Sequence, residues 1–169
     1  MKILAGKFGG RLIKTSQKLK YRPTKSIIRK SIFDSLNNFC FNSVLDLFSG
    51  TGILGFEAAS RGAQSVTFVE NNLEAFRLLK INADYLSGPE YSFHKKDAFL
   101  FLKKSKKYDL VFADPPYLKY DLTKITETIL EQLNKKGKFY LECEKNQSSF
   151  MDGVVRDYGR TRILYWENI

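Results

Sequence analysis

The sequence predicts an α/β fold built on a doubly wound, mostly parallel sheet. The first supporting observation is that short apolar runs alternate with helix-like apolar patterns along most of the chain. The second is a glycine-rich turn directly after the first of these runs, at the place where doubly wound folds bind a ligand. With 169 residues, 43% of them apolar, the chain has the size and composition of one globular domain.

The N-terminal part precedes this alternation. The segment KILAGKFGGRLIKT predicts two short strands joined at Gly9-Gly10, and a polar linker follows it. Apolar residues between Ile27 and Leu36 then recur at helical spacing, and Thr24 or Ser26 is placed to cap the helix that they predict. We therefore expect a hairpin arm and a helix before the main sheet.

From Ser43 onward, strands and helices are expected in turn. Strands are expected at residues 43–48, 65–70, 91–96, 108–114, 138–144, 154–159 and 161–167, the last two as a closing antiparallel pair. Helices are expected at residues 53–62, 73–86, 98–104 and 121–137, the last one stopped by Gly137. We assign residues 1–21 to a basic N-terminal β-hairpin arm and residues 22–169 to the main domain.

Charge is the strongest signal of the overall composition. The 28 Lys and Arg against 18 Asp and Glu give a net charge of +10, and the pI is near 9.5. Such a field attracts polyanions, which favours a nucleic-acid partner. The alternative is that an AT-rich genome raises the lysine content everywhere, so charge alone does not establish a partner.

Other features exclude whole classes of function. The two cysteines, Cys40 and Cys143, form no CxxC pair and follow no secretory signal, so a reduced, cytoplasmic setting is expected and a zinc site is not. The single histidine, His94, argues against a histidine-based triad or metal cluster. No apolar run approaches the roughly 20 residues needed to span a bilayer, so no integral membrane protein is expected.

The glycine-rich turn after the first expected strand reads DLFSGTGILG and has Gly50, Gly52 and Gly55 in GxGxxG spacing. Glycines here let the backbone turn sharply and approach a ligand closely. The motif alone is weak evidence, because a glycine-rich turn also occurs without a ligand.

Three acids at the ends of expected strands strengthen the ligand interpretation. Glu70 lies about 20 residues past the first glycine, where a carboxylate can accept hydrogen bonds from both ribose hydroxyls. Asp46, just ahead of the glycines, would repel a pyrophosphate but attract the cationic amino-acid end of S-adenosylmethionine. Asp97 can accept from the adenine amino group. Each acid alone could be a solvated loop residue or a helix cap, but three at successive strand ends favour an adenosine cofactor.

The stretch Asp114-Pro115-Pro116-Tyr117 directly follows another apolar run. Prolines cannot donate to a sheet ladder, so these residues are expected where a strand ends. Taken alone, an Asp-Pro turn with a packed tyrosine explains them about as well as a functional site does.

Together, DxFxGxG at residues 46–52, Glu70, Asp97 and DPPY at residues 114–117 resemble the class I S-adenosylmethionine-dependent methyltransferases that alkylate exocyclic amino groups. The match covers the core from about Val44 to Glu144. The resemblance implies a Rossmann-like, seven-stranded sheet and S-adenosylmethionine as cofactor. The cofactor-binding residues expected from it are Asp46, Phe48, Gly50, Gly52, Glu70, Asn71, Asp97 and Ala98.

The chemistry of amine methylation explains the residue types in DPPY. An exocyclic amine conjugated with its base is a poor nucleophile, because its lone pair is delocalised into the ring. Hydrogen bonds to the Asp114 carboxylate and the Pro115 carbonyl would localise that lone pair toward the methyl donor. Pro115 and Pro116 would fix the backbone, and Tyr117 would offer a face for the base to stack on. These four residues are the expected catalytic set.

The N-terminal third narrows the resemblance further. ILAGKFGGRLIKT followed by YRPTKSIIRKSIFDSL is similar to the RsmD-type 16S ribosomal RNA guanine-N2 methyltransferases, as is LDLFSGTGILGFEAASRGA over residues 45–63. The chain departs from that family at Lys30, where Glu is usual, and at Ser26, where Asp is frequent. These departures concern salt bridges around the helix and leave the expected catalytic set unchanged.

This resemblance implies a guanine in 16S rRNA as substrate, within the small subunit or an assembly intermediate. The fold and size allow a monomer, and no metal is expected from the few Cys and His residues. The residues expected to contact RNA or border the base pocket are Arg11, Lys14, Lys20, Arg22, Thr24 and Arg29. A DNA adenine-N6 methyltransferase shares DPPY but normally carries an added recognition domain. A protein glutamine methyltransferase prefers NPPY. A catalytically inert RNA-binding module of the same fold is the remaining alternative.

Overall fold

The computed structural model describes residues 1–17, 19, 24–36, 41–104, 106–116 and 119–169. The helices are α1 (Ser26–Ser35), α2 (Ile53–Ser60), α3 (Leu73–Tyr85), α4 (Ala98–Leu102) and α5 (Leu122–Glu131). The strands are β1 (Ser43–Leu47), β2 (Ser65–Val69), β3 (Glu90–His94), β4 (Tyr108–Ala113), β5 (Leu133–Glu144), β6 (Val154–Tyr158) and β7 (Thr161–Glu167). They confirm the predicted alternation of strands and helices.

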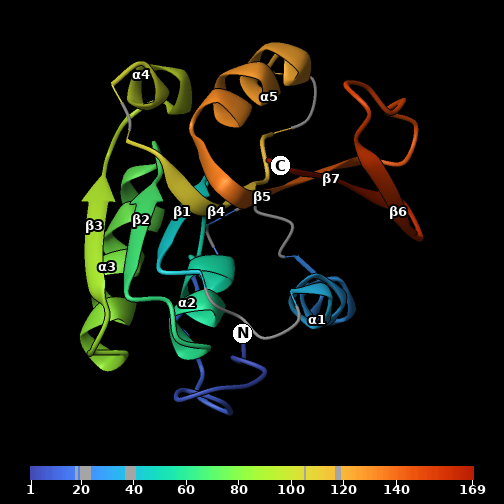
Figure 1. The fold of residues 1–169 in the computed structure, drawn as a ribbon. Helices are drawn as coiled ribbons and strands as arrows, with labels where there is room; N and C mark the ends of the chain where they lie inside the picture. Colours follow the sequence, from blue (N-terminus) through green and yellow to red (C-terminus); the bar gives the residue numbers. More distant parts are fainter. Residues whose placement is uncertain (18, 20–23, 37–40, 105, 117–118) are drawn as a thin grey trace.

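The strands form one seven-stranded sheet in the order β3-β2-β1-β4-β5-β7-β6 (Figure 1). The pairs from β3 to β5 are parallel, and β7 runs antiparallel to both β5 and β6. The chain thus moves outward from β1 in one direction, returns, and continues from β4 in the other. This confirms the doubly wound, mostly parallel sheet, and it creates a switch point between β1 and β4, where such sheets bind ligands.

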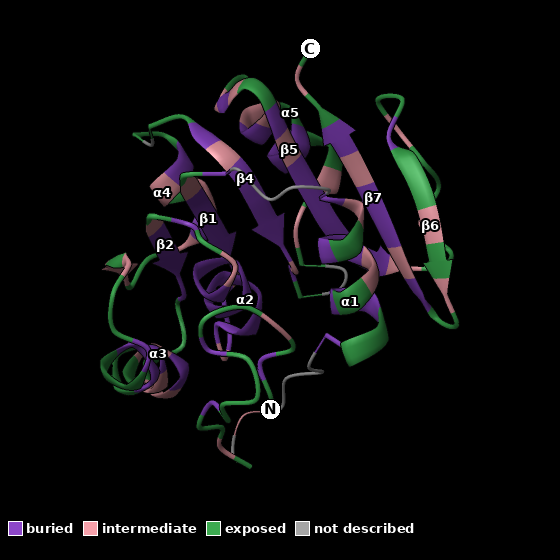
Figure 2. Cartoon of the chain, turned by 60° about the horizontal axis from the view of Figure 1, so that its bottom comes forward, coloured by how far each residue is buried: buried purple, intermediate pink, exposed green. Residues whose placement is uncertain are grey.

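Two apolar layers cover the two faces of the sheet. One layer contains apolar residues of α1, α2 and α3, including Ile28, Phe33 and Phe56. The other contains residues of α4 and α5, including Leu102 and Ile129. Figure 2 shows the buried strands between these layers and the exposed outer surface of α1. Because both faces are covered, the central strands are nearly continuous apolar runs, as the sequence indicates.

The N-terminal arm is less regular than predicted. A single antiparallel bridge joins Lys2 and Leu12, and no regular strand forms there within residues 1–17. The reason is that neighbouring arm amides bond to α2 instead of a second strand: Phe8 donates to the Ser60 hydroxyl at 2.8 Å. The apolar side chains of the arm, among them Ile3 and Phe8, lie in the same core as α1 and α2.

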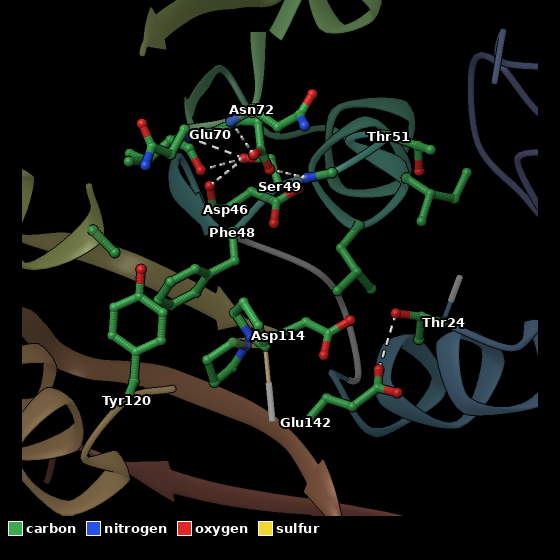
Figure 3. Close-up of a pocket in the computed structure, with 18 of the residues that line it drawn as sticks. Thr24, Asp46, Phe48, Ser49, Thr51, Glu70, Asn72, Asp114, Tyr120 and Glu142 are labelled. Atoms are coloured by element: carbon green, nitrogen blue, oxygen red, sulfur yellow. Dashed lines mark hydrogen bonds between the residues drawn. The ribbon is translucent and has the colours of Figure 1, made fainter. Parts of the chain in front are cut away.

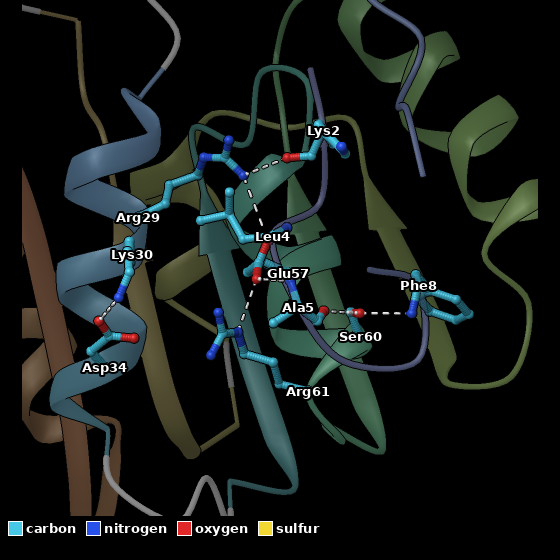
Figure 4. A network of polar contacts seen from close by, with 10 residues as sticks. All are labelled: Lys2, Leu4, Ala5, Phe8, Arg29, Lys30, Asp34, Glu57, Ser60 and Arg61. Atoms are coloured by element: carbon cyan, nitrogen blue, oxygen red, sulfur yellow. Dashed lines mark hydrogen bonds and ion pairs between the residues drawn. The ribbon is translucent and has the colours of Figure 1, made fainter. Parts of the chain in front are cut away.

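The anchor of the arm is Glu57, a fully buried carboxylate of α2 (Figure 4). It accepts hydrogen bonds from the amides of Leu4 at 2.7 Å and Ala5 at 3.2 Å. Arg29 of α1 and Arg61 approach the same carboxylate at 3.5 and 2.9 Å. One side chain therefore joins the arm, α1 and α2.

The predicted C-terminal end of the helix at 121–137 is wrong. Helix α5 ends at Glu131, and β5 begins at Leu133, which pairs with Tyr108 of β4. Leu133 continues the apolar helical spacing, but here it extends the sheet, and the polar residues after it contain no apolar position that could distinguish helix from strand.

The predicted capping of α1 is also wrong. The residue before α1 is Lys25, which makes no side-chain cap bond, and Ser26 is the first helical residue. The Thr24 hydroxyl donates instead to Glu142 of β5 at 2.9 Å. The Thr24 hydroxyl therefore bonds to a side chain of a distant strand and not to the first turn of α1.

Candidate active site

A cavity of about 610 Å³ opens at the carboxyl ends of β1, β2, β4 and β5, at the switch point of the sheet. Its wall combines the glycine-rich turn, acids from several strand ends and the start of DPPY (Figure 3). The sequence-predicted residues that line it are Thr24, Asp46, Phe48, Gly50, Glu70, Asn71, Ala98, Asp114, Pro115 and Pro116. The structure therefore brings together most of the residues predicted for the cofactor and the catalytic set.

The glycine-rich turn has a backbone that requires its glycines. Gly52 has φ of 77°, and a Cβ atom there would lie 2.4 Å from the Leu79 side chain. Gly55, which faces the sheet, would place a Cβ atom 2.3 Å from the Phe68 ring. Gly52 allows the turn, and Gly55 allows the close packing of α2 on β2.

Glu70 fixes the turn in place. Its Oε2 accepts a hydrogen bond from the Gly50 amide at 2.8 Å, and its Oε1 accepts one from the Asn72 amide at 2.7 Å. Ser49 ties the ends of β1 and β2 together, since its hydroxyl donates to the Asp46 carbonyl at 2.6 Å and accepts from the Val69 amide at 3.0 Å. The predicted ribose-binding carboxylate thus also orients the loop that would border the ribose.

Asp46 is buried at the bottom of the cavity, with 3% of its surface exposed. Burial raises the pKa of its carboxyl to about 8; the Gly55 amide, which donates to Asp46 at 3.0 Å, opposes this rise, and the negative charge of Glu70 adds to it. A cation in the cavity would favour the ionised form of Asp46. Together with Glu70, Asp46 makes this end of the cavity suited to a positively charged ligand.

Asp97 lies beside the cavity and does not line it. Its Oδ1 caps α4 by accepting from the amides of Phe99 and Leu100, and its Oδ2 accepts from the Tyr120 hydroxyl at 3.0 Å. The ring of Tyr120 meets that of Phe48 edge to face, with centroids 4.9 Å apart, and both residues line the cavity. Contact of Asp97 with an adenine amino group stays a prediction.

DPPY begins where β4 ends at Ala113. Asp114 is partly exposed, Pro115 is buried, and both line the cavity together with Pro116. Tyr117 is outside the described residues. The placement of Asp114 and Pro115 agrees with the expectation that the prolines stop the strand, and it puts a carboxylate and a neighbouring carbonyl at the mouth of the cofactor-sized space.

The basic residues predicted to contact RNA are placed differently from one another. Arg11 and Lys14 are exposed; the Arg11 guanidinium donates to the Tyr85 carbonyl at 2.8 Å, and the Lys14 ammonium lies 4.5 Å from the Tyr85 ring centre. Lys20 and Arg22 are outside the described residues. Thr24 lines the cavity.

The placement of Arg29 is a correction. Its side chain is 4% exposed and lies beneath the arm, where it donates to the Lys2 carbonyl at 3.0 Å and pairs with Glu57. A side chain so deeply buried holds protein elements together and does not reach an RNA. The sequence placed Arg29 among the residues expected to contact RNA or border the base pocket, because its partner Glu57 lies on a different helix and leaves no local signal.

Sequence reasoning missed several residues of the cavity wall. These include Ser49, Asn72, Lys96, Lys119, Tyr120 and Glu142. Glu142 had the clearest signal, because it is a charged residue within the otherwise apolar run FYLEC of a central strand. Tyr120 had no such signal, because its partners Phe48 and Asp97 come from other loops.

Within the described residues, no group of three or more His, Cys, Asp or Glu side chains is arranged to hold a metal ion. Among the helices described, none is long and apolar enough to cross a membrane.

The strand order, the glycine-rich turn and the acidic cavity at the switch point define an S-adenosylmethionine-dependent methyltransferase. A comparison with known families identifies the family. Over residues 1–166 the chain matches the family described as "Conserved hypothetical protein 95", and it belongs to that family.

Similar proteins agree with this membership. The chain is 37% identical over 152 residues to ribosomal RNA small subunit methyltransferase D of Buchnera aphidicola subsp. Acyrthosiphon pisum, covering 86% of this chain and 79% of that protein. It is 30% identical to the protein of the same name from Escherichia coli K12, over 85% of this chain and 75% of that protein.

Solved structures show the same fold over nearly the whole chain. A hypothetical protein of Thermus thermophilus superimposes with a TM-score of 0.86 at 29% identity, covering 98% of both chains. A putative methylase of Haemophilus influenzae superimposes with a TM-score of 0.82 at 26% identity, covering 99% of this chain and 98% of that one.

Proposed function

We propose that the protein transfers the methyl group of S-adenosylmethionine to the exocyclic N2 of a guanine in 16S rRNA. The observation that carries the proposal is the presence of Asp114 and Pro115 on the wall of the cavity that also contains Asp46 and Glu70. Methylation of a conjugated amine needs hydrogen-bond acceptors beside the methyl donor, because the amine must be held with its lone pair toward the methyl group. The names of the relatives support small-subunit rRNA as the substrate.

The cofactor side of the site follows from the acids and the turn. When bound, S-adenosylmethionine supplies a methyl group carried on a positively charged sulfur. Glu70 would accept from the ribose hydroxyls, and Asp46 would favour the cationic amino-acid end, because a nearby positive charge stabilises its ionised form. Asn71 and Ala98, on the wall beside Glu70, would border the adenine. The carboxylates thus bind the cofactor by its hydroxyls and its positive charge.

The acceptor side lies at DPPY. The Asp114 carboxylate and the Pro115 carbonyl would each accept one N–H of the guanine amine, and this orients the lone pair toward the methyl donor. The base must leave its stack to reach the cavity, and stacking on Tyr117 would hold it there. The amine is positioned by acceptors already fixed at the end of β4, so little rearrangement is needed at the reaction step.

The arm offers a path for the RNA backbone. Its returning half runs along α3, since Arg11 bonds to Tyr85 at the C-terminal end of α3 and the Ser16 hydroxyl donates to Glu74 in the first turn. Asn72, immediately before α3, already lines the cavity. The exposed cations Arg11 and Lys14 therefore lie on a strip that leads to the cavity edge, where phosphate contacts would position the substrate.

The test of the proposed reaction is methyl transfer to small ribosomal subunits isolated from a strain that lacks the enzyme. We expect labelled S-adenosylmethionine to label N2 of one guanine of 16S rRNA, and a single chain to suffice. Label on DNA adenine or on protein, with none on guanine N2, would refute the assignment. Comparing methyl transfer to intact subunits, assembly intermediates and naked rRNA identifies which of them is the substrate that the enzyme methylates in the cytoplasm.

A variant separates binding from chemistry. Asp114→Ala should abolish transfer while calorimetric titration finds an affinity for S-adenosylmethionine within a few-fold of the wild type, because Asp114 faces the acceptor. Lost cofactor affinity with retained turnover would contradict its role.

A second pair of variants tests the arm. Arg11→Ala with Lys14→Ala should weaken binding to the subunit and lower its salt dependence, because each phosphate contact contributes to the salt slope. The control is Lys107→Ala with Lys135→Ala, two exposed cations at the opposite, amino end of β4 and β5 with the same change in charge. Equal effects of the two pairs would remove the arm from the proposal.

A further inference from the structure

Glu142, a residue of β5, reaches the cavity beside the acceptor residues. It is 5% exposed, and its Oε2 accepts a hydrogen bond from the Thr24 hydroxyl at 2.9 Å. It lines both the main cavity and an adjoining cavity of about 180 Å³, and both cavities also include Pro115 and Pro116. Glu142 therefore lies where the two spaces meet, next to the residues that would hold the amine.

The strand register places Glu142 next to Asp114. In the parallel pairing of β4 and β5, Phe112 faces Tyr140 and Ala113 faces Leu141, so Asp114 and Glu142 are the next pair along. The ring centroids of Phe112 and Tyr140 are 6.1 Å apart, so these two side chains lie on the same face of the sheet. Side chains alternate along a strand, so the two acids, each two residues further on, extend from that same face. Figure 3 shows Glu142 extending toward Thr24 on the side of the cavity where Asp114 lies.

Two adjacent carboxylates match one nucleobase edge better than the others. Guanine presents two neighbouring donors, the N2 amine and N1–H. Adenine and cytosine also carry an exocyclic amine, but the ring nitrogen beside it is an acceptor in both. A carboxylate that accepts from N1–H of guanine would face a lone pair in the other two bases, and hydrogen-bonding sites reject such mismatched partners strongly.

We propose that Glu142 reads N1–H of the target guanine while Asp114 holds its N2 amine, and that Thr24 positions the Glu142 carboxylate for this contact. The inference rests on the proposed function, since it assumes that an amine is bound at Asp114. It makes Glu142 a specificity-determining residue that touches the substrate. It also explains why a carboxylate occupies a central strand between apolar residues.

The test compares guanine with 2,6-diaminopurine at the target position of reconstituted small subunits. Diaminopurine keeps the 2-amino group but has an unprotonated N1. The wild type should methylate guanine at least about 100-fold more efficiently, in the range expected when a buried polar group loses its partner. Glu142→Gln, whose amide can accept from N1–H through its oxygen and donate to an unprotonated N1 through its nitrogen, should bring the two substrates within about tenfold.

Control variants distinguish a loss of base recognition by Glu142 from a loss of stability. Glu144→Gln is the matched control, because Glu144 lies two residues further along β5 and lines only the adjoining cavity. It should leave the preference for guanine unchanged. Thr24→Val should reduce the preference by several-fold and Thr24→Ser should restore it, with the affinity for S-adenosylmethionine unchanged throughout. If Glu142→Gln lowers the melting temperature, Glu142→Asp replaces it, because Asp keeps the charge and shortens the reach.

The outcomes separate this inference from the proposed function. If the wild type labels no guanine, the proposed function is wrong and this inference is wrong with it. If the wild type labels guanine, but Glu142→Gln and Glu142→Asp keep its preference over diaminopurine, only the reading role of Glu142 is overturned. A narrowed preference in the Glu142 variants, with none in Glu144→Gln, supports the inference.

Discussion

Replacing Glu57 by Gln removes the negative charge of a carboxylate that solvent does not reach. Glu57 is 0% exposed and faces Arg29, itself 4% exposed, so the substitution leaves a buried guanidinium without its counter-charge. Burial already lowers the pKa of the Arg29 guanidinium, and Glu57 opposes that shift. The amide of Gln would also turn a donor toward the Leu4 or Ala5 amide, where the carboxylate accepts from both.

The expected loss is large for one substitution. Removing one partner of a buried ion pair costs about 3–5 kcal/mol, a substantial part of the roughly 5–15 kcal/mol that stabilises a domain. At about 2–4 °C per kcal/mol for a chain of this size, the melting temperature should fall by about 6–20 °C. Urea unfolding followed by far-UV circular dichroism measures the free energy, and calorimetry measures the melting temperature.

The control is Lys30→Gln, which breaks the exposed pair between Lys30 and Asp34, whose side chains are 69% and 53% exposed. Exposed helical pairs contribute about 0.3–0.5 kcal/mol, so this variant should melt within about 1–2 °C of the wild type. Arg29→Met combined with Glu57→Gln should recover part of the loss, because the buried charge is then gone. The reasoning is refuted if Glu57→Gln costs less than about 1 kcal/mol, or no more than Lys30→Gln.

Other predictions concern the cavity. The pKa of Asp46, raised to about 8, lies above its value in the unfolded chain of about 3.9. Between these two pH values the folded state therefore binds one more proton than the unfolded state. The unfolding free energy of the cofactor-free protein should fall as pH rises from about 4 to 8. The unfolding equilibrium constant should increase by at most about tenfold per pH unit. Asp46→Asn should flatten this slope, and parallel stability curves for the two proteins would contradict the assignment. Gly55→Ala should destabilise the fold by about 1–3 kcal/mol in urea despite the better helix propensity of Ala, because the new Cβ meets the buried Phe68 ring; a neutral effect would mean that the ring can move. Tyr120→Phe should tighten binding of S-adenosylmethionine by about two- to tenfold in calorimetry if Asp97 accepts from adenine, because it frees one carboxylate oxygen; unchanged affinity would count against that role of Asp97.

Local patterns predicted most of the fold. The apolar run of β4 and the glycine-rich turn after β1 lie where the sequence placed them, because buried strands and tight turns leave strong signals in short windows. The predictions of secondary structure were wrong where a short window is compatible with both helix and strand. The polar residues after Leu133 contain no apolar position that distinguishes helix from strand. Leu133 itself pairs with Tyr108 of β4, and this tertiary contact begins the strand.

The candidate site was predictable for a topological reason. The carboxyl ends of parallel strands meet at one edge of a sheet, so acids placed after successive strands converge even though they are far apart in the chain. This rule brought Asp46, Glu70 and Asp114 to one cavity. It could not say that Asp97 would turn its carboxylate to Tyr120 and the first turn of α4, because that choice depends on another loop.

Residue spacing alone was enough to predict the order of the elements, the sheet, the glycine-rich turn and the acids at its edge, because these depend on local pattern and on the geometry that parallel strands impose. Whether an individual charged side chain is buried or exposed depended on the tertiary packing. Arg29 is buried against Glu57, and Glu142 stands beside Asp114 with the hydroxyl of Thr24, 118 positions away, against it. A charge is solvated or buried according to what packs on it from distant segments, and no local pattern contains that information.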